Sequence, residues 1–436
     1  MNPPPSDRER DLSESKRWLA RARAVVPGAA QTFSKGPTVF VQGAAPNFLA
    51  RAQGAYAWDV DGNRYIDYIM GLGPVILGHG YPAVNDAVRA QLDVGASFSL
   101  PHPIEVEVSE LLLEFVPWAQ MVRFAKNGSD ATSGAVRLAR AFTSRDVVAC
   151  CGYHGWQDWF IGSTSRSRGV PDAVRALTVP FPYNDLEALA AVFEARREKV
   201  ACVIMEPVAF TEPRPGFLEG VKELCRANGS LLIFDEVVAG FRMNLGGAHA
   251  RFGVEPDLAC FGKAIANGFP LAAIVGRRDV MTLFEEVFFS FTFGGEAVSL
   301  AACRATLREL RDRDVPGHLW HVGEQLKDRT NRLIERAELS SCVSCVGFAP
   351  WTTLSFRDQN GRAALLIKSL FQQEVLKRGI LTHGNHMLSL SHDEAIVDNT
   401  MAAYEPAFTV LAAAIRDGQV ERRLEGPPVQ AVFRQA

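Results

Sequence analysis

The chain contains five short, almost wholly apolar runs, and this feature constrains its fold most strongly. They read VVACC, VACVIME, SLLIFDE, LACFG and LAAIVG, and all lie between residues 147 and 276. Such runs are typical of strands buried on both faces of a parallel sheet, which helices between the strands cover. One intervening segment, NDLEALAAVFEARREK, places apolar residues at helical spacing, with Asn184 or Asp185 as its cap. The sequence therefore predicts an α/β fold with a largely parallel central sheet.

The length of the chain, 436 residues, exceeds what one simple core accommodates, so we expect more than one domain. Residues 1–72 contain a helical segment, SESKRWLARARAVV, and a hairpin-like segment that turns on Asp61 and Gly62. Residues 73–310 hold the apolar runs and form the predicted large domain. Residues 311–436 form a third part that is poor in motifs.

Lys263 is the only charged residue in LACFGKAIANGFPLAAIVG, the segment from Leu258 to Gly276. An ammonium group among apolar neighbours loses its proton easily, and the neutral amine is a nucleophile toward carbonyl groups. Asp235 ends the run LLIFD, and open α/β sheets hold ligands at the carboxyl ends of their strands. The amine and the carboxylate together suggest a site for pyridoxal phosphate. The ordinary alternatives are a lysine that extends to solvent and an acidic residue that begins a helix.

Two further segments could supply the phosphate and ring contacts that this cofactor requires. Asn127, Gly128 and Ser129 precede a helical pattern, and free amides at the start of a helix attract phosphate. Tyr153 and His154 follow the run VVACC, where an aromatic side chain can stack on a ring. Taken alone, the first segment would be an ordinary helix cap and the second a pair of core residues. The interpretation therefore depends on these motifs occurring together.

The segments LLIFDEVVAGFR and DLACFGKAIANGFPLAAIVG resemble the signature of class-III aminotransferases, in particular the branch of glutamate-1-semialdehyde aminomutase. The likeness extends from WDVDGNRYIDYIMGLGPVILGHGYP through NGSDAT, GYHGW, MEPV and FTFGGEAVSLAA to LSLSHDEAI. It implies fold type I of the pyridoxal-phosphate-dependent transferases, with a large domain on a mostly parallel sheet and a small α/β domain. Residues 1–72 and 311–436 would together form the small domain.

The resemblance implies catalytic roles for two residues. Lys263 would bind the cofactor aldehyde as a Schiff base and would then carry the proton between the substrate's α-carbon and the cofactor. Asp235 would pair with the pyridinium nitrogen and keep it protonated.

The resemblance also implies residues that bind the phosphate, cover the two ring faces and line the pocket. These residues are Asn127, Gly128, Ser129, Tyr153, His154, Glu206 and Val237, with Thr292 contributed by the neighbouring subunit. The implied partner is therefore a second copy of the chain, in a homodimer with shared active sites.

Composition and charge favour an enzyme of small molecules. The formal net charge is −3, and no long basic run is present, so we expect neither nucleic acid nor an anionic membrane as partner. No apolar run reaches membrane length and the first residues lack a signal-peptide core, which predicts a cytoplasmic protein. The cysteines are scattered, as reduced thiols are. Cys342, Cys345 and the nearby His383, His386 and His392 lack zinc-site spacing, and we predict no metal.

The substrate is inferred from departures from the aminomutase pattern. In PGAAQTFSKGP, Lys35 occupies the region in which the aminomutase has a carboxylate-binding arginine, and THGNHMLSLSH has neither acid nor arginine. We expect an amino acid donor and a neutral or polyhydroxylated carbonyl acceptor, such as a keto-sugar, in place of glutamate 1-semialdehyde. The alternatives are an aminomutase, an epimerase or racemase, and a cofactor-binding homologue without activity.

Overall fold

The computed structural model describes residues 10–208, 210–358, 360–362 and 364–431. The chain forms two compact units. The central unit comprises Pro74–Ile76 and Pro82–Gly317. Among the described residues, the terminal unit comprises 10–73, Leu77–Tyr81 and those between 318 and 431.

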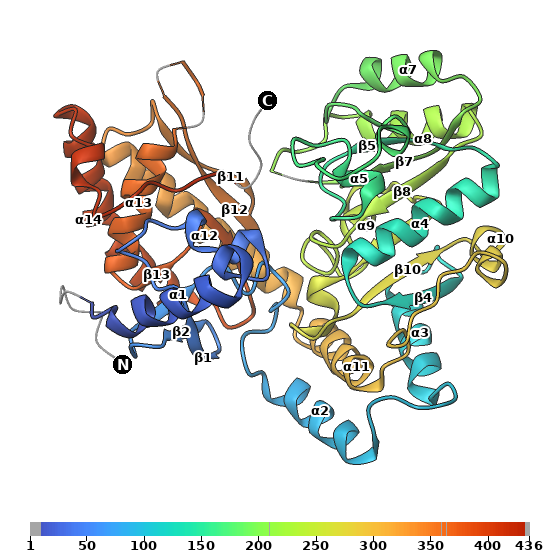
Figure 1. Ribbon diagram of the computed structural model, residues 1–436, viewed down its shortest axis with the longest axis horizontal. Helices are drawn as coiled ribbons and strands as arrows, with labels where there is room; N and C mark the ends of the chain where they lie inside the picture. Colours follow the sequence, from blue (N-terminus) through green and yellow to red (C-terminus); the bar gives the residue numbers. More distant parts are fainter. Residues whose placement is uncertain (1–9, 209, 359, 363, 432–436) are drawn as a thin grey trace. The chain divides into compact units, whose positions relative to one another are not determined.

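A seven-stranded sheet of order β4-β10-β9-β8-β7-β5-β6 forms the centre of the central unit (Figure 1). Strands β9, β8, β7, β5 and β6 are parallel, and β10 is antiparallel to its neighbours β9 and β4. The five apolar runs are five of these strands, which confirms the predicted α/β fold with its mostly parallel sheet. The strand bounds are β4 Met121–Ala125, β5 Val147–Cys151, β6 Thr178–Pro180, β7 Val200–Met205, β8 Leu231–Asp235, β9 Leu258–Phe261 and β10 Ala272–Gly276.

Successive residues of the inner strands point to opposite faces of this sheet. On one face, Val148 and Cys150 of β5 belong to the same core cluster as Leu138 of α4 (Gly128–Thr143). On the other face, Ala149 clusters with residues of α7 (Leu186–Ala195) and α8 (Phe217–Ala227), and Figure 1 shows these helices apart from α4. Because both faces are covered, every residue of β5 is buried, and the run is continuously apolar.

Capping explains where α7 begins, and the remaining helices complete the central unit. Of the two predicted cap residues, Asp185 is the one used: its side chain accepts a hydrogen bond from the amide of Ala188 at 2.8 Å. The other helices of this unit are α2 Pro82–Val94, α3 Pro103–Phe115, α5 Asp158–Ile161, α6 Asp172–Arg175, α9 Ala248–Phe252, α10 Arg278–Met281 and α11 Ala297–Asp312. The next helix, α12 Val315–Arg336, belongs to the terminal unit from His318 onward.

Two small sheets and long helices form the terminal unit, with sheet orders β1-β2-β3-β13 and β11-β12-β14. The predicted hairpin is β2 and β3, an antiparallel pair, and Gly62 in its turn has φ 88°, a conformation that glycine adopts without strain. The bounds are α1 Ser13–Val25, β1 Leu49–Gln53, β2 Tyr56–Asp59, β3 Arg64–Asp67, β11 Val343–Phe348, β12 Trp351–Phe356, α13 Leu365–Lys377, β13 Ile380–Leu381, β14 Asn385–Met387 and α14 Glu394–Arg416.

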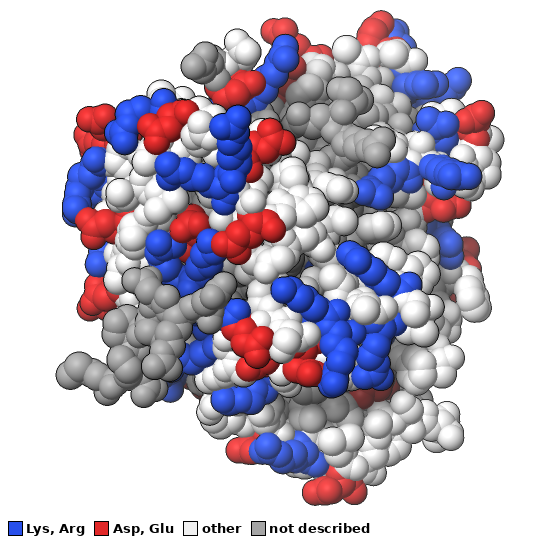
Figure 2. Space-filling model, turned by 60° about the vertical axis from the view of Figure 1, so that its left-hand side comes forward, with Lys and Arg blue, Asp and Glu red and all other residues white. Residues whose placement is uncertain are grey.

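The surface carries both signs of charge. On the face shown in Figure 2, acidic and basic side chains are interspersed over most of the area. Among the described residues, the structure contains no helix with the length and apolar character needed to span a bilayer.

Candidate active site

Four neighbouring parallel strands bring the candidate residues to one edge of the central sheet. Tyr153 and His154 follow β5, Glu206 follows β7, and Asp235 ends β8. β9 pairs in parallel with β8 and ends two residues before Lys263. Parallel strands have their carboxyl ends at the same edge, about 4.8 Å apart from neighbour to neighbour. The sheet therefore gathers residues that are more than a hundred positions apart in sequence.

Asp235 is held by two hydrogen bonds. Its Oδ2 shares one with His154 Nδ1 at 2.8 Å, and its Oδ1 accepts one from the amide of Val237 at 3.0 Å. Both members of the first pair are buried, at 4% exposure for the aspartate and 1% for the histidine. Thr132 of α4 fixes the histidine in turn, because its hydroxyl donates to the His154 carbonyl at 2.7 Å. The carboxylate therefore has one orientation, set by three separate segments of the chain.

Glu206 is a half-buried carboxyl group next to this pair. Its Oε2 accepts a hydrogen bond from the amide of Tyr153 at 3.1 Å. Burial raises the pKa of Glu206 to about 7, and the negative charge of Asp235 acts in the same direction. The close fit depends on Gly152, because a Cβ there would lie 2.4 Å from Glu206 Oε2. A proton on this carboxyl group is therefore exchangeable near neutral pH.

Lys263 begins a short 3-10 turn after β9, with φ 43°, in the left-handed region. Its side chain is half-buried. Burial lowers the pKa of the ammonium group, while the carboxylates of Glu206 and Asp235 oppose that shift. Left-handed backbone at a residue other than glycine is uncommon and is concentrated at functional sites. The arrangement supplies an amine that is neutral more readily than an ordinary lysine.

The start of α4 forms a closely packed surface beside Val237. The amide of Asn127 donates to Asp130 Oδ2 at 2.8 Å, so Asn127 caps the helix that begins at Gly128. A Cβ on Gly128 would lie 2.7 Å from Val237 Cγ1, and one on Gly155 would lie 2.3 Å from Ser129 Cβ. Only glycine leaves the helix start open at these two points, and the first amides of a 16-residue helix attract an anion.

Two of the predicted residues are more exposed. Tyr153 is 51% exposed, and its ring meets Phe160 edge to face, with 5.5 Å between the ring centroids. Thr292 is exposed in the single chain, and no hydrogen bond joins it to the group around Lys263 among residues 10–208, 210–358, 360–362 and 364–431. The structure therefore brings the other candidates together, whereas Thr292 stays apart from them in one copy of the chain.

Sequence reasoning missed one charged residue of this site. Arg242, from the segment that follows β8, is fully buried, and its positive charge contributes to the lowered pKa of Lys263. Burial lowers the pKa of Arg242 itself to about 10. An available signal was its position in LLIFDEVVAGFR, where it is a charged residue directly after an apolar stretch.

A buried chain of hydrogen bonds supports the same segment. Glu236 Oε1 shares a hydrogen bond with His249 Nδ1 at 3.0 Å, and Trp118 Nε1 donates to His249 Nε2 at 2.9 Å. Glu236 Oε2 accepts from the amide of Ala248 at 2.9 Å, at the start of α9. Glu236 therefore has a structural role at the start of α9.

The residues present fit pyridoxal phosphate. The site holds a buried carboxylate for a protonated ring nitrogen, a neutral-prone amine for an aldehyde and a glycine-lined helix start for a phosphate. A model of the family described as "Aminotransferase class-III" matches residues 40–411. The chain belongs to this family.

The aminotransferase is similar to curated and solved proteins over nearly its whole length. It is 37% identical over 434 residues to a glutamate-1-semialdehyde 2,1-aminomutase of Roseiflexus castenholzii, covering 93% of this chain and 99% of the relative. The internal aldimine form of the FumI protein of Sphingopyxis sp. MTA144, with pyridoxal phosphate, has a TM-score of 0.87 and 30% identity, covering 96% and 99%. An omega-transaminase from Sphaerobacter thermophilus has a TM-score of 0.83 and 28% identity, covering 92% and 98%.

These similarities confirm the family and the fold type that the motifs implied. The protein is a class-III aminotransferase, and its cofactor is pyridoxal phosphate. Members of the family act on an amino donor and an acceptor, so this enzyme has small-molecule substrates of both kinds.

Proposed function

We propose that this aminotransferase moves the amino group of an amino acid to a neutral or polyhydroxylated carbonyl acceptor, such as a keto-sugar or another biosynthetic intermediate. The position of Lys263, half-buried within electrostatic reach of Asp235 and Glu206, is the observation that carries the transfer. The choice of acceptor rests on Lys35, the only basic residue of PGAAQTFSKGP. A lysine cannot bind a carboxylate through two parallel hydrogen bonds, as an arginine does.

Two residues of the chain would perform the proton chemistry. When bound, pyridoxal phosphate supplies an aldehyde that links to amines and a ring that accepts electrons from a carbanion. Lys263 would hold the cofactor through Nζ, and the same amine, once released, would take the proton from the substrate's α-carbon. Burial lowers the pKa of Lys263, which keeps the amine able to accept that proton. Asp235 would hold a proton on the ring nitrogen, with His154 keeping its carboxylate in place.

The remaining candidates would bind and orient the cofactor. Gly128 and Ser129, with the capping residue Asn127, would hold the phosphate at the start of α4. Tyr153 and Val237 would cover the two faces of the ring, and the valine already contacts the helix start. His154 and Glu206 would line the pocket.

We further propose that two copies form a homodimer in which Thr292 completes the site of its neighbour. Thr292 lies between Phe291 and Phe293, which are 37% and 57% exposed. The carbonyl of Ala96 accepts a hydrogen bond from the amide of Ala297, and Phe98 and Leu100, two residues and four residues after Ala96, are exposed as well. Exposed large apolar side chains that gather on one surface favour protein association. Sedimentation velocity of the wild type and of Phe293→Glu tests the proposal. A dimer that becomes a monomer supports it, and a wild-type monomer that is fully active contradicts it.

A donor and acceptor screen that follows the absorbance of the cofactor tests the proposed reaction. An amino acid given alone should yield its oxo acid in stoichiometric amount, and a neutral or polyhydroxylated carbonyl compound should then restore the starting spectrum. The acceptor assignment fails if glutamate 1-semialdehyde has the highest kcat/KM. It also fails if only dicarboxylic acceptors restore the spectrum.

An aminomutase is the second candidate, because a curated relative with that name is 37% identical over most of the chain. An epimerase or racemase would use the same residues, since only the site of reprotonation differs. With the substrate alone, an aminomutase releases no oxo acid in stoichiometric amount and forms an isomer. Mass balance of the single-substrate reaction separates the three outcomes.

A further inference from the structure

A partly buried ion pair of the central unit lies next to the residues that would bind the phosphate. Lys126 directly follows β4 and precedes Asn127, the cap of α4, and its Nζ donates to Glu296 Oε2 at 2.9 Å. Glu296 precedes α11 and follows Thr292 by four positions. The two side chains are 15% and 16% exposed. The pair therefore joins the two segments of one chain to which the proposed function assigns phosphate contacts.

Both carboxylate oxygens of Glu296 also accept hydrogen bonds from the start of α11. Oε1 accepts from the amide of Val298 at 2.7 Å, and Oε2 accepts from the amide of Ser299 at 3.1 Å. Burial alone would raise the pKa of Glu296, but hydrogen bonds from Ser299 and Lys126 outweigh burial and leave the pKa lowered. The carboxylate is therefore ionised at neutral pH and attaches Lys126 to the first turn of α11.

The other end of the segment before Glu296 is attached to β4 and α4 as well. Arg137 of α4 donates from Nη1 to the carbonyl of Phe288 at 2.8 Å. Arg123 of β4 donates from Nη2 to the carbonyl of Phe289 at 3.0 Å. The loop that carries Thr292 lies between these contacts and the ion pair, so β4 and α4 hold it at both ends.

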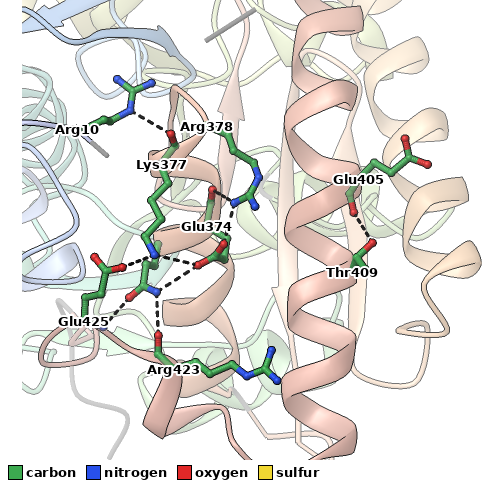
Figure 3. A network of polar contacts seen from close by, with 9 residues as sticks. Arg10, Glu374, Lys377, Arg378, Glu405, Thr409, Arg423 and Glu425 are labelled. Atoms are coloured by element: carbon green, nitrogen blue, oxygen red, sulfur yellow. Dashed lines mark hydrogen bonds and ion pairs between the residues drawn. The ribbon is translucent and has the colours of Figure 1, made fainter. Parts of the chain in front are cut away.

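Figure 3 shows ion pairs of a different kind, on α13 in the terminal unit. Lys377 Nζ lies 3.4 Å from Glu374 Oε1 and also contacts Glu425, and the side chain of this lysine is 39% exposed. Solvent screens exposed pairs, which contribute little, whereas removal of one partner from a buried pair leaves an uncompensated charge. Lys126, at 15%, is closer to the second case. Loss of its charge should therefore displace Glu296 and the segment attached to it.

We propose that Lys126 and Glu296 are positioning residues for the phosphate of the cofactor. Their ion pair fixes the start of α4 against the loop 290–295. The helix amides of one copy, and the Thr292 hydroxyl that would serve the neighbouring copy, then stay in place for their phosphates. Neither member of the pair has to touch the phosphate itself. The inference rests on the proposed function, which assigns the phosphate to these two segments.

Equilibrium dialysis of the full-length protein, freed of cofactor, tests the pair without turnover. Pyridoxal phosphate and pyridoxal are compared, because pyridoxal has the aldehyde and the ring but no phosphate. Lys126→Met should weaken the Kd for pyridoxal phosphate about tenfold or more and change the Kd for pyridoxal by less than about twofold. Lys377→Met, which breaks the exposed pairs of Figure 3, should change neither Kd. An equal ratio of the two Kd values in wild type and Lys126→Met overturns the proposal, and so does an equal change of that ratio in both variants.

The acid of the pair separates positioning from a direct effect of charge. If Lys126 attracted the phosphate directly, removal of the opposing charge in Glu296→Gln would tighten the binding of pyridoxal phosphate. Positioning predicts a Kd weakened about fivefold or more, because glutamine keeps an acceptor for α11 but offers no charge to the lysine. The losses should not add in the double variant, since each substitution breaks the same pair. Tighter or unchanged binding by Glu296→Gln overturns the proposal, also where Lys126→Met fails to fold, and additive losses overturn it too.

The same measurements keep this inference separate from the proposed function. If the wild type binds pyridoxal phosphate and pyridoxal with equal Kd, the proposed phosphate site at the start of α4 fails. If the wild type prefers pyridoxal phosphate and Lys126→Met keeps that preference, only the role of the ion pair fails. Thr292→Val should also weaken the binding of pyridoxal phosphate. An unchanged Kd in that variant removes the hydroxyl from the proposed site, and Lys126→Met still decides whether the pair positions the start of α4.

Discussion

Lys263 and Lys368 are both half-buried lysines with lowered pKa values, yet their neighbours differ in one decisive respect. Lys263 has the carboxylates of Glu206 and Asp235 within electrostatic reach, whereas Lys368 has the ring of His383. Acids beside the first lysine moderate the shift caused by burial, so the amine can alternate between its two protonation states. Burial lowers the pKa of the second lysine, and the charge of Asp67 acts on the neighbouring His383. Burial alone thus does not determine what a lysine does.

The largest difference between the two lysines is expected in turnover. Lys263→Ala should lower kcat by about 10³-fold or more, because it removes both the covalent anchor and the proton carrier. Single-turnover absorbance measurements with a saturating amino acid provide the rate. Lys222→Ala, an exposed lysine of the same unit, is the control. Undiminished turnover in Lys263→Ala would remove the contrast with Lys368.

The acid beside Lys263 is the next element of the contrast. Asp235→Asn keeps the shape of the side chain but removes its charge, and we expect kcat to fall about 10²-fold to 10³-fold. The hydrogen bond to His154 can persist, so the loss reports the charge rather than the fold. Thermal unfolding of Asp235→Asn checks that the fold is retained. A kcat within threefold of the wild type would show that no negative charge is needed there.

Packing should also distinguish the two sites. The Cβ added by Gly155→Ala would lie 2.3 Å from Ser129 Cβ, which is too close for two carbon atoms. The Cβ added by Gly384→Ala would lie 3.7 Å from its nearest neighbour, Lys368 Cε. Both glycines have positive φ, 116° and 95°, so backbone strain is similar in the two variants. We expect Gly155→Ala to cost about 1–3 kcal/mol more than Gly384→Ala in free energy of unfolding. Equal losses in urea titrations would refute the close packing at the helix start.

The smallest expected effect concerns the pH dependence of cofactor capture. Ionised Glu206 raises the pKa of Lys263, so Glu206→Gln should lower that pKa. The apoenzyme of the variant should therefore bind pyridoxal phosphate covalently at lower pH than the wild type does. The carboxyl group of Glu206 also faces Asp235, His154 and the amide of Tyr153, and its own pKa is about 7. The wild-type curve should therefore contain an ionisation near pH 7 that the variant lacks. Stopped-flow absorbance across pH 5–9 would show it, and identical curves would exclude coupling between the two groups.

Much of the fold could be predicted from local patterns. Strands that are buried on both faces of the sheet are apolar throughout, so they could be recognised in the sequence. The turn at Gly62 could be predicted because glycine follows Asp61 there. Lys263 was found because it is the only charge in an apolar segment, a property of the sequence itself. Thr292 and the dimer remain predictions, since one copy of the chain does not test them.

Pairings between distant residues could not be predicted in the same way. Glu236, His249 and Trp118 form one chain of bonds although 131 positions separate the indole from the imidazole. His383 was considered only as a weak metal ligand, because nothing local indicates that the side chain of Lys368 approaches the neighbouring Gly384. Such contacts depend on how helices pack on sheets, which a single sequence does not specify.

Adjacent strands of the sheet carry His154, Glu206 and Asp235 at or just after their ends. This arrangement affects how the enzyme could evolve to accept new substrates. Strand separation sets the spacing of these groups, so the surface loops beyond them can lengthen, shorten or mutate while the reacting atoms keep their places. Libraries for directed evolution are therefore best confined to those loops, with the sheet edge left untouched.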